Sequence, residues 1–415
     1  MKIYKLKDLI QIHNGMPYSN LKVGNIPLYG SGGLMSFVND YLYDGEAILL
    51  PRKGTLSNIL YTNGKIWTVD TMYYATTNET ANSYYLYSYL SILSLEHLDS
   101  GSTLPSMTKF AYGNIEIELP HIDYQNKVAK FLKSIAAKIE LNSQINQELE
   151  AMAKTLYEYW FVQFDFPNEQ GKPYKSSGGK MIYNKELKRE IPEGWEVKEL
   201  SRCIELIIDH RGKTPKKLGG DWSVETDAII ALSAKIVKDG KLKNLDQANK
   251  VSRKLYNRWM PIKLQDGDIL MTSEAPAGEF YFIYGFTEYC LSQRLFAMRA
   301  NKNIVLPSYF YYELSKGHGY SQIQGSLSGS TVFGIRQDVL RTVKVVIPDL
   351  SLQKKFDSIV IPQLKQIKQL DYQNQKLAEL RDWLLPMLMN GQVTVGDVEE
   401  DLNIAAEPIE KYGIK

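Results

Sequence analysis

The residues most suggestive of enzymatic chemistry are Gly212, Lys213 and Thr214, which resemble the end of a phosphate-binding loop. That loop needs another glycine five residues before the first of these, so that backbone amides can surround the phosphates. The chain has Ile207 there, and Pro215 follows where a helix should begin. We therefore reject a phosphate-binding loop at this position.

Other catalytic and metal-binding patterns are also incomplete. Glu196-Val197-Lys198 imitates half of a nuclease motif, but the nearest preceding aspartate is Asp165, on the far side of a polar stretch. Two cysteines are too few for a structural zinc site or a disulfide framework, and the five histidines have no ligand spacing. The sequence lacks a dinucleotide fingerprint, an HExxH motif and the Asn/Asp-Pro-Pro-aromatic segment of amino-methyltransferases. These absences favour binding over catalysis.

The composition predicts a folded protein of two or more domains, with 415 residues of which 44% are hydrophobic and 23% charged. No run approaches the roughly 18 apolar residues of a membrane helix, so we expect a cytoplasmic protein with no membrane partner. The charge is uneven. Residues 191–347 carry 22 Lys and Arg against 17 Asp and Glu, whereas 1–120 carry 8 against 10. The positive balance of 191–347 is typical of a polyanion binder.

The chain contains an internal duplication. Gly-Ser-Thr at 101–103 recurs at 329–331, a shift of 228 positions. Further residues match at this shift and in the same order: Pro120 with Pro348, Gln125 with Gln353, Lys127 with Lys355, Ile139 with Ile367, Asn146 with Asn374, and Leu156 with Leu384. An ordered series at one shift indicates two copies of one unit.

Each copy begins with a strand-rich part and ends with a helical part. Short apolar runs between turn signals such as Asn63-Gly64 and Asp266-Gly267 predict mixed, strand-dominated domains, and hence an α+β fold. The expected segments are domains at 1–120 and 191–347, helical regions at 121–166 and 348–392, a polar linker or surface excursion at 167–190, and a tail at 393–415.

Apolar residues recur at heptad spacing in both helical regions, which predicts two long helices packed on each other as a coiled coil. The predicted seam contains Leu132, Ile135, Ile139, Asn142, Asn146, Leu149 and Leu156 in the first helix, and Ile367, Leu370, Asn374, Leu377 and Leu384 in the second. Asparagine at such positions reduces stability but fixes register. Pro362 should divide the second helix, and Pro386 should end it early. The alternative is two independent core helices.

These features resemble the specificity subunits of type I restriction–modification systems, in which tandem variable domains alternate with two repeated helical segments. The resemblance covers nearly the whole chain. The most specific part is the segment that joins the copies, with FDFPN at 164–168, GKPYKSSGGKM at 171–181 and PEGWEV at 192–197. Further similar elements are GSGG at 30–33, PRKGTL at 51–56, RGKTP at 211–215, DGDIL at 266–270, CLSQRL at 290–295 and LLPMLMNGQV at 384–393.

The resemblance implies a non-catalytic DNA reader with a pseudo-twofold duplication. Target recognition domains at 1–120 and 191–347 would each read one half of a bipartite double-stranded DNA target. The helices would form an antiparallel spacer that docks two modification (methyltransferase) subunits. S-adenosylmethionine, ATP and magnesium would then belong to partner subunits and not to this chain. Whether restriction subunits join the complex stays open.

We expect the DNA contacts to come from basic and hydroxyl side chains on loops that the strands position. The candidates are Ser31, Arg52, Lys53, Thr55, Ser102, Thr103 and Lys109 in the first domain, and His210, Arg211, Lys213, Thr214, Lys216, Lys217, Ser273, Arg294, Ser330 and Thr331 in the second. Arg52 is suited to a bidentate contact with guanine. The alternative for each is an ordinary exposed polar side chain.

Two other classes of function compete with the DNA reader. An enzyme, such as a fused modification–specificity protein, would need the motifs that are missing here. A tandem interaction or ligand-binding adaptor without a nucleic-acid role would keep the architecture. Strong, salt-dependent binding to one split duplex would distinguish the reader from this adaptor.

Overall fold

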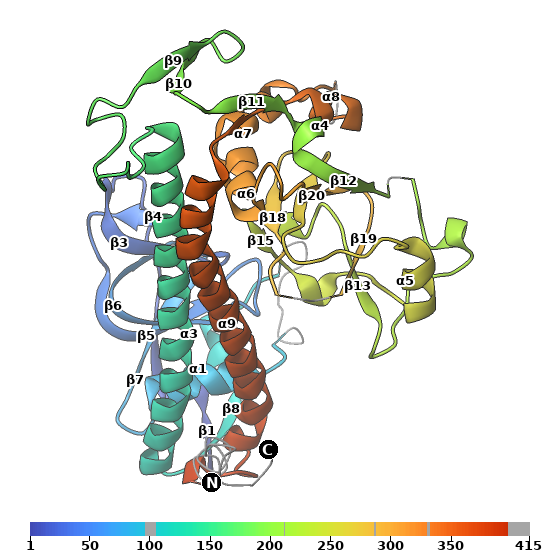
Figure 1. Cartoon of the computed structure of the whole chain (residues 1–415). Helices are drawn as coiled ribbons and strands as arrows, with labels where there is room; N and C mark the ends of the chain where they lie inside the picture. Colours follow the sequence, from blue (N-terminus) through green and yellow to red (C-terminus); the bar gives the residue numbers. More distant parts are fainter. Residues whose placement is uncertain (96–104, 211, 286–287, 330–332, 397–415) are drawn as a thin grey trace, which may run out of the picture. The chain divides into compact units, whose positions relative to one another are not determined.

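In the computed structural model, the chain forms two compact units (Figure 1). Unit 1 comprises Met1–Leu141 and Gln373–Lys415, and unit 2 comprises Asn142–Tyr372. Each of the two long helices therefore contributes one part to each unit. The described residues are 1–95, 105–210, 212–285, 288–329 and 333–396.

A six-stranded, mostly antiparallel sheet forms the body of unit 1. Its order from edge to edge is β2 (Ile10–His13), β7 (Met72–Thr77), β5 (Tyr43–Pro51), β6 (Leu60–Thr68), β3 (Val23–Gly30) and β4 (Gly33–Val38). The pairing of β3 with β6 is parallel. The apolar run from Ala47 to Leu50 is completely buried in β5, as expected for an inner strand that packs on both faces.

Helix α1 (Ser83–Ser91) packs against β5 and β6. It begins after Asn82, whose side-chain oxygen accepts hydrogen bonds from the backbone amides of Tyr84 and Tyr85, each at 3.0 Å. The remaining elements of unit 1 are β1 (Lys2–Lys5), which pairs with β8 (Glu116–Leu119), the 3-10 turn η1 (Leu6–Asp8) and α2 (Lys109–Gly113). β8 leads directly into the first long helix, so the sheet domain and the helix form one body.

Unit 2 contains two small sheets. One has the order β12 (Ile204–Asp209), β20 (Leu295–Ala300), β17 (Ile269–Thr272) and β18 (Phe280–Phe282), and the other β16 (Lys250–Val251), β13 (Ile229–Leu232) and β19 (Tyr289–Leu291). Two-stranded pairs are β11 (Glu196–Glu199) with β21 (Lys344–Ile347), and β14 (Val237–Lys238) with β15 (Lys241–Leu242). The helices are α4 (Leu200–Cys203), η4 (Lys216–Leu218), η5 (Leu245–Gln247), α5 (Arg253–Trp259), α6 (Pro307–Ser315), α7 (His318–Gly325) and α8 (Gln337–Thr342).

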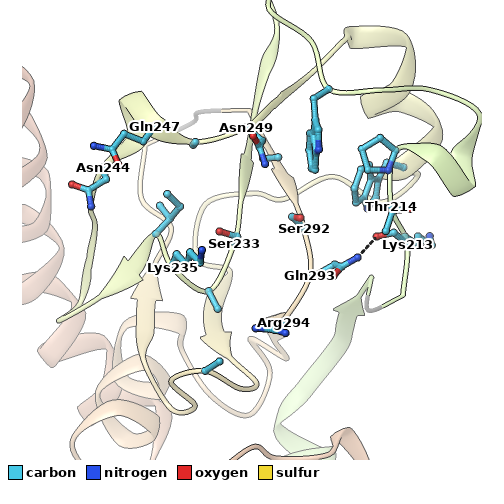
Figure 2. Close-up of a pocket in the computed structure, with 18 residues that line it drawn as sticks. Lys213, Thr214, Ser233, Lys235, Asn244, Gln247, Asn249, Ser292, Gln293 and Arg294 are labelled. Atoms are coloured by element: carbon cyan, nitrogen blue, oxygen red, sulfur yellow. Dashed lines mark hydrogen bonds between the residues drawn. The ribbon is translucent and has the colours of Figure 1, made fainter. Parts of the chain in front are cut away.

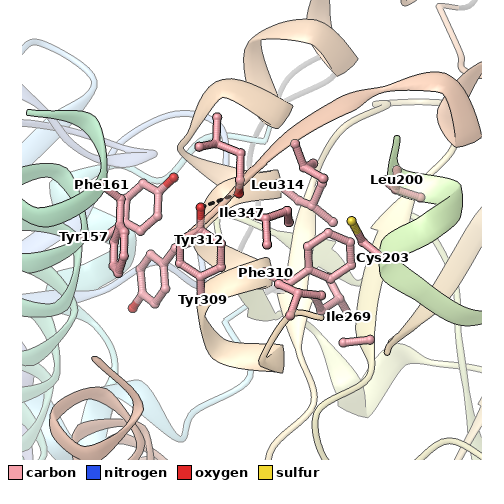
Figure 3. Packing of buried hydrophobic residues seen from close by; sticks show 14 of the residues in the cluster. Tyr157, Phe161, Leu200, Cys203, Ile269, Tyr309, Phe310, Tyr312, Leu314 and Ile347 are labelled. Carbon is pink, nitrogen blue, oxygen red and sulfur yellow. Dashed lines mark hydrogen bonds between the residues drawn. The ribbon is translucent and has the colours of Figure 1, made fainter. Parts of the chain in front are cut away.

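Aromatic side chains fill the main core of unit 2 (Figure 3). Tyr157, near the end of the first long helix, stacks on Tyr312 of α6 with ring centroids 5.6 Å apart. Phe161 meets Tyr309 edge to face at 4.7 Å. Because helix and domain share this core, they fold as one body.

The stretch expected to be a linker or surface excursion contains a hairpin of β9 (Met181–Asn184) and β10 (Arg189–Pro192). Phe166 precedes it and is buried, stacking on Tyr174 at 4.6 Å and on Trp195 at 5.4 Å. These aromatic contacts hold the segment against unit 2.

The two long helices are α3 (Ile122–Tyr157), which continues into the π-helical turn η3 (Glu158–Val162), and α9 (Leu350–Met389). The predicted interruptions at Pro362 and Pro386 are wrong, because α9 runs through both. An interior proline costs a helix about 3 kcal/mol. Both prolines are exposed, and the buried neighbours Val360 and Leu385 offset that cost by packing. Among the described helices, none is long and apolar enough to span a membrane.

The two long helices pair antiparallel, and residues of the predicted seam lie where they meet. In unit 1, Leu132 and Ile135 of α3 share a core with Leu384 of α9, and Ile139 and Leu377 pack against it. This joins the start of α3 to the end of α9.

In unit 2 the other ends of the two helices meet. The Asn146 amide donates to the Asp371 carboxylate at 2.7 Å and to the Ile367 carbonyl at 3.4 Å. Asn142 is buried, and the remaining seam positions of unit 2 are half-buried: Leu149, Leu156 and Leu370. Asn374, which belongs to unit 1, is half-buried as well.

The duplication extends to individual hydrogen bonds. Gln125 accepts from the backbone amide of Asn82 at 2.9 Å and donates to the carbonyls of Thr80 and Pro120. Gln353 accepts from the amide of Leu306 at 2.7 Å and donates to the carbonyls of Ile304 and Pro348. Both glutamines are almost completely buried. The alignment of these glutamines by a shift of 228 positions is therefore confirmed.

Candidate nucleic-acid interface

In unit 1, two predicted contact residues lie on one tyrosine ring. The Arg52 guanidinium and the Lys109 ammonium are 5.9 and 5.7 Å from the centroid of Tyr73. Lys109 also donates to the Ile12 carbonyl at 2.8 Å, and Arg52 reaches the Asp70 carbonyl at 3.4 Å. These contacts hold both cations beside the Tyr73 ring, near the end of β5.

The turn between β3 and β4 meets the loop after β5. Asn58 donates to the Ser31 carbonyl at 2.8 Å. Gly54 has φ +87°, and a Cβ there would lie 3.2 Å from the Ser31 hydroxyl, so this close approach favours glycine. Lys53 and Thr55 flank Gly54 and are exposed. The structure thus brings Ser31, Arg52, Lys53, Thr55 and Lys109 to one region of unit 1.

In unit 2, Lys213, Thr214 and Arg294 line one pocket of about 640 Å³ (Figure 2). They come from segments about 80 positions apart, and Gln293 joins them by donating to the Lys213 carbonyl at 3.1 Å. The volume lies in the usual range for small-molecule sites.

Arg294 stands at this pocket with φ +65°, which is unusual for a residue other than glycine. Its guanidinium lies 3.4 Å from a Glu274 carboxylate oxygen. Its carbonyl accepts from the Ser273 amide at 2.9 Å. Strained backbone conformations of this kind cluster at binding and catalytic sites, where surrounding contacts maintain them.

Two of the predicted contact residues have buried side chains. His210 is 6% exposed and Ser273 is 2% exposed. Burial lowers the pKa of His210, with a smaller contribution from the Lys213 ammonium.

The remaining predictions divide into exposed and undescribed residues. Lys216 and Lys217 are exposed on η4, and Lys217 donates to the Gly212 carbonyl at 2.8 Å. The predicted contacts outside the described residues are Ser102, Thr103, Arg211, Ser330 and Thr331.

Sequence reasoning missed most of the pocket. Its further lining includes Trp222 and Trp259 and the carboxamides of Asn244, Gln247 and Asn249. The polar run at 243–250 was a usable signal, because three carboxamides within six residues are unusual for a strand-rich core. Nothing in the local sequence indicated that this run would face Lys213.

No catalytic constellation appears in the part of the chain that the structure describes. No group of three or more His, Cys, Asp or Glu could hold a metal ion there. Cys203 and Cys290 are buried, and burial raises the pKa of each thiol to about 12. Such thiols are poor nucleophiles.

Comparison with known proteins gives one consistent family. The family model described as "Type I restriction modification DNA specificity domain" matches residues 1–151 and 192–380. The chain is 25% identical over 357 residues to the type I restriction enzyme MjaIX specificity subunit of Methanocaldococcus jannaschii, covering 84% of this chain and 72% of that protein. It is 24% identical over 352 residues to a putative type I restriction enzyme specificity subunit of Haemophilus influenzae, covering 82% and 81%.

A solved structure shares the fold. The crystal structure of a type I restriction–modification S subunit from M. genitalium matches with a TM-score of 0.61 and 13% identity, over 93% of this chain and 95% of that one. At this identity the match concerns the fold alone. The α+β architecture predicted from the sequence is therefore confirmed.

Proposed function

Because the chain belongs to the type I restriction–modification DNA specificity family, we propose that it is the specificity subunit of such a complex and reads a bipartite DNA target. The domain ending at residue 120 reads one half, and 191–347 reads the other. The chain itself supplies recognition. The methyl donor, ATP and magnesium bind to the partner subunits of the complex.

The observation that carries this proposal is the repeated glutamine clamp. Gln125 and Gln353 each tie the loop before a domain helix (α1 or α6) to the first turn of a long helix, through three hydrogen bonds. Each recognition domain is thereby fixed to its own helix. Two readers built in the same way on paired helices suit a target with two separated halves.

The candidate contacts support DNA as the ligand. Arg52 follows β5 and Arg294 precedes β20, Lys213 lies in the loop after β12, and Lys109 begins α2, so these four cations lie in or beside loops, where recognition residues are commonly placed. Arginine can bind guanine bidentately, and lysine contributes phosphate contacts. The paired helices then serve as the spacer and as the docking surface for two modification subunits.

The direct experiment is to map methylated adenines in DNA exposed to this chain with its cognate modification subunit. We expect methylation at one split sequence, and none with the chain alone. Methylation that ignores the chain, or that follows a single uninterrupted sequence, would contradict the proposal. Replacing 191–347 by the recognition domain of a relative should change one half of the target and leave the other half unchanged.

A further inference from the structure

The pocket of unit 2 has a lining that differs from an ordinary protein surface. None of the described residues that line it is an aspartate or a glutamate. Cations and carboxamides are present instead, including Lys213, Lys235 and Asn249. A carboxamide both donates and accepts hydrogen bonds, as the edge of a nucleobase does. The lining therefore favours a planar polar group that carries negative charge nearby.

Two tryptophans provide an aromatic wall. Trp222 and Trp259 lie with ring centroids 6.2 Å apart and an angle of 35° between the rings. Trp259 is completely buried, whereas Trp222 is 41% exposed. The Trp259 indole nitrogen is buried without a hydrogen-bond partner among the described residues. A buried polar atom normally has a partner, and a bound group with an acceptor atom would supply one for this nitrogen.

The charged residues lie on the same pocket as this wall. Figure 2 shows Lys213 and Thr214 on one segment, with Gln293 and Arg294 facing them from the connection between β19 and β20. The Arg294 guanidinium is half exposed and rests beside Glu274 at 3.4 Å, in the geometry of a surface ion pair. Such a pair is weak in water, so a phosphate can compete for this arginine.

We propose that this pocket binds a single unstacked nucleotide, with its base against Trp222, its polar edge toward Asn249 and Gln293, and its phosphate toward Lys213 and Arg294. Aromatic side chains bind bases of any identity by stacking, and carboxamides add selectivity. The nucleotide comes either from the DNA target or from free nucleotide in solution. The DNA source rests on the proposed function, whereas the free source does not.

The first arm of the test uses the complete complex with its modification subunits and a target duplex. Single abasic sites are placed opposite each position of the half-target read by unit 2, because loss of the opposing base lowers the cost of extruding a nucleotide. We expect affinity to rise about tenfold at one position besides those opposite methylated adenines. Trp222→Ala should abolish the gain at that position and keep the gains opposite methylated adenines.

Matched variants separate stacking from folding. Trp222→Phe should retain most of the gain, since a smaller ring still stacks. Tyr183→Ala removes an aromatic ring that is 61% exposed on the β9–β10 hairpin, away from the pocket lining, and should leave all gains unchanged. Asn249→Asp alters an exposed pocket residue and should reduce the gain in affinity, because a carboxylate cannot donate a hydrogen bond to the edge of the base.

The second arm measures binding of the four deoxynucleoside monophosphates to the full chain by calorimetry. Binding that Trp222→Ala and Asn249→Asp abolish, without an abasic gain in the first arm, would assign the pocket to free nucleotide. If neither arm gives a signal that depends on Trp222, the proposal is overturned. Methylation of the intact split target by the wild-type complex is measured separately. If that methylation is absent, the proposed function is wrong, whatever the pocket binds.

Discussion

The Tyr157 hydroxyl donates a 2.6 Å hydrogen bond to the Glu313 carboxylate inside unit 2. This contact joins the end of α3 to α6, and both side chains are almost completely buried. The other carboxylate oxygen accepts from the backbone amides of Gly319 and Val346, each at 3.2 Å. Burial still raises the pKa of Glu313 to about 7, because the loss of water destabilises the anion more than these donors stabilise it.

Glu313 should make unit 2 less stable as the pH rises. The unfolded chain loses this proton near its ordinary pKa of 4.5, whereas the folded chain keeps it until about 7. The contribution is therefore complete below pH 4.5 and lost as the pH passes through 7. Between pH 4 and 8, the unfolding free energy of Glu313→Gln should therefore rise relative to that of the wild type by up to about 3 kcal/mol.

Denaturant unfolding at several pH values measures this difference. Glu225→Gln changes an exposed glutamate of the same unit and is the matched control, with a pH dependence like that of the wild type. Parallel stability curves for Glu313→Gln and the wild type would mean that Glu313 is ionised in the folded protein.

The two glutamine clamps should be equally important. Gln125→Ala and Gln353→Ala each remove three hydrogen bonds and leave a backbone amide and two carbonyls without this partner. We expect each variant to lose about 2–4 kcal/mol of unfolding free energy. Gln→Glu at either position keeps the acceptor but loses the amide donor. Its loss of unfolding free energy should be smaller at low pH, because the protonated carboxyl can donate one hydrogen bond. A large loss at one position and none at the other would contradict equivalent roles.

Long-range periodicity was the part of the fold that the sequence predicted well. Leu132 and Ile135 occupy the two apolar heptad positions of α3, and their spacing of three places them on one helix face whatever the tertiary context; Leu384 belongs to the matching stripe of α9. The prolines of α9 were predicted wrongly because local propensity is weaker than the packing of a 40-residue helix.

Contact residues were harder to predict, because side-chain exposure depends on distant segments. His210 and Ser273 have the right chemistry but are buried by strands from elsewhere in unit 2. Lys213 and Arg294 were predicted individually, whereas their common pocket arises only when the chain folds. Trp222 could not be distinguished from a core tryptophan, since aromatic residues usually pack inside.

Arg52 and Arg294 should affect different halves of the target. Replacing Arg52 by alanine removes a potential bidentate contact with guanine, and replacing Arg294 by alanine removes a potential contact with the phosphate of the nucleotide in the unit 2 pocket; we expect each to cost about 1–3 kcal/mol of binding free energy. Binding of the complex is measured on duplexes in which one half-target or the other is scrambled. On a duplex whose first-domain half-target is scrambled, Arg52→Ala should bind with the same affinity as the wild type. On a duplex whose second-domain half-target is scrambled, the same should hold for Arg294→Ala. Lys254→Ala, at an exposed lysine of α5 outside the pocket, is the control for general loss of positive charge. Equal losses on every duplex would indicate phosphate contacts without base selection.

The paired helices should determine the spacing between the half-targets. Four residues inserted in both helices, after Gln144 in α3 and after Tyr372 in α9, keep the pairing that Asn146 and Asp371 mark. The insertion lengthens each helix by about 6 Å and rotates its continuation by about 40°. One or two added base pairs lengthen a duplex by roughly 3–7 Å and rotate it by roughly 35–70°, which matches this change. The methylated target should therefore gain one or two base pairs between its halves, and the bases within each half should stay the same.

A two-residue insertion at the same positions provides the contrast. It adds about 3 Å but rotates the continuation by about 200°, which no single added base pair can match, so methylation of any split target should be lost while both domains remain folded. Methylome sequencing reports the spacing, and circular dichroism reports the fold. Full activity at the original spacing after the four-residue insertion would exclude the helices as the spacer, because a rigid connection of that length cannot change without moving the readers.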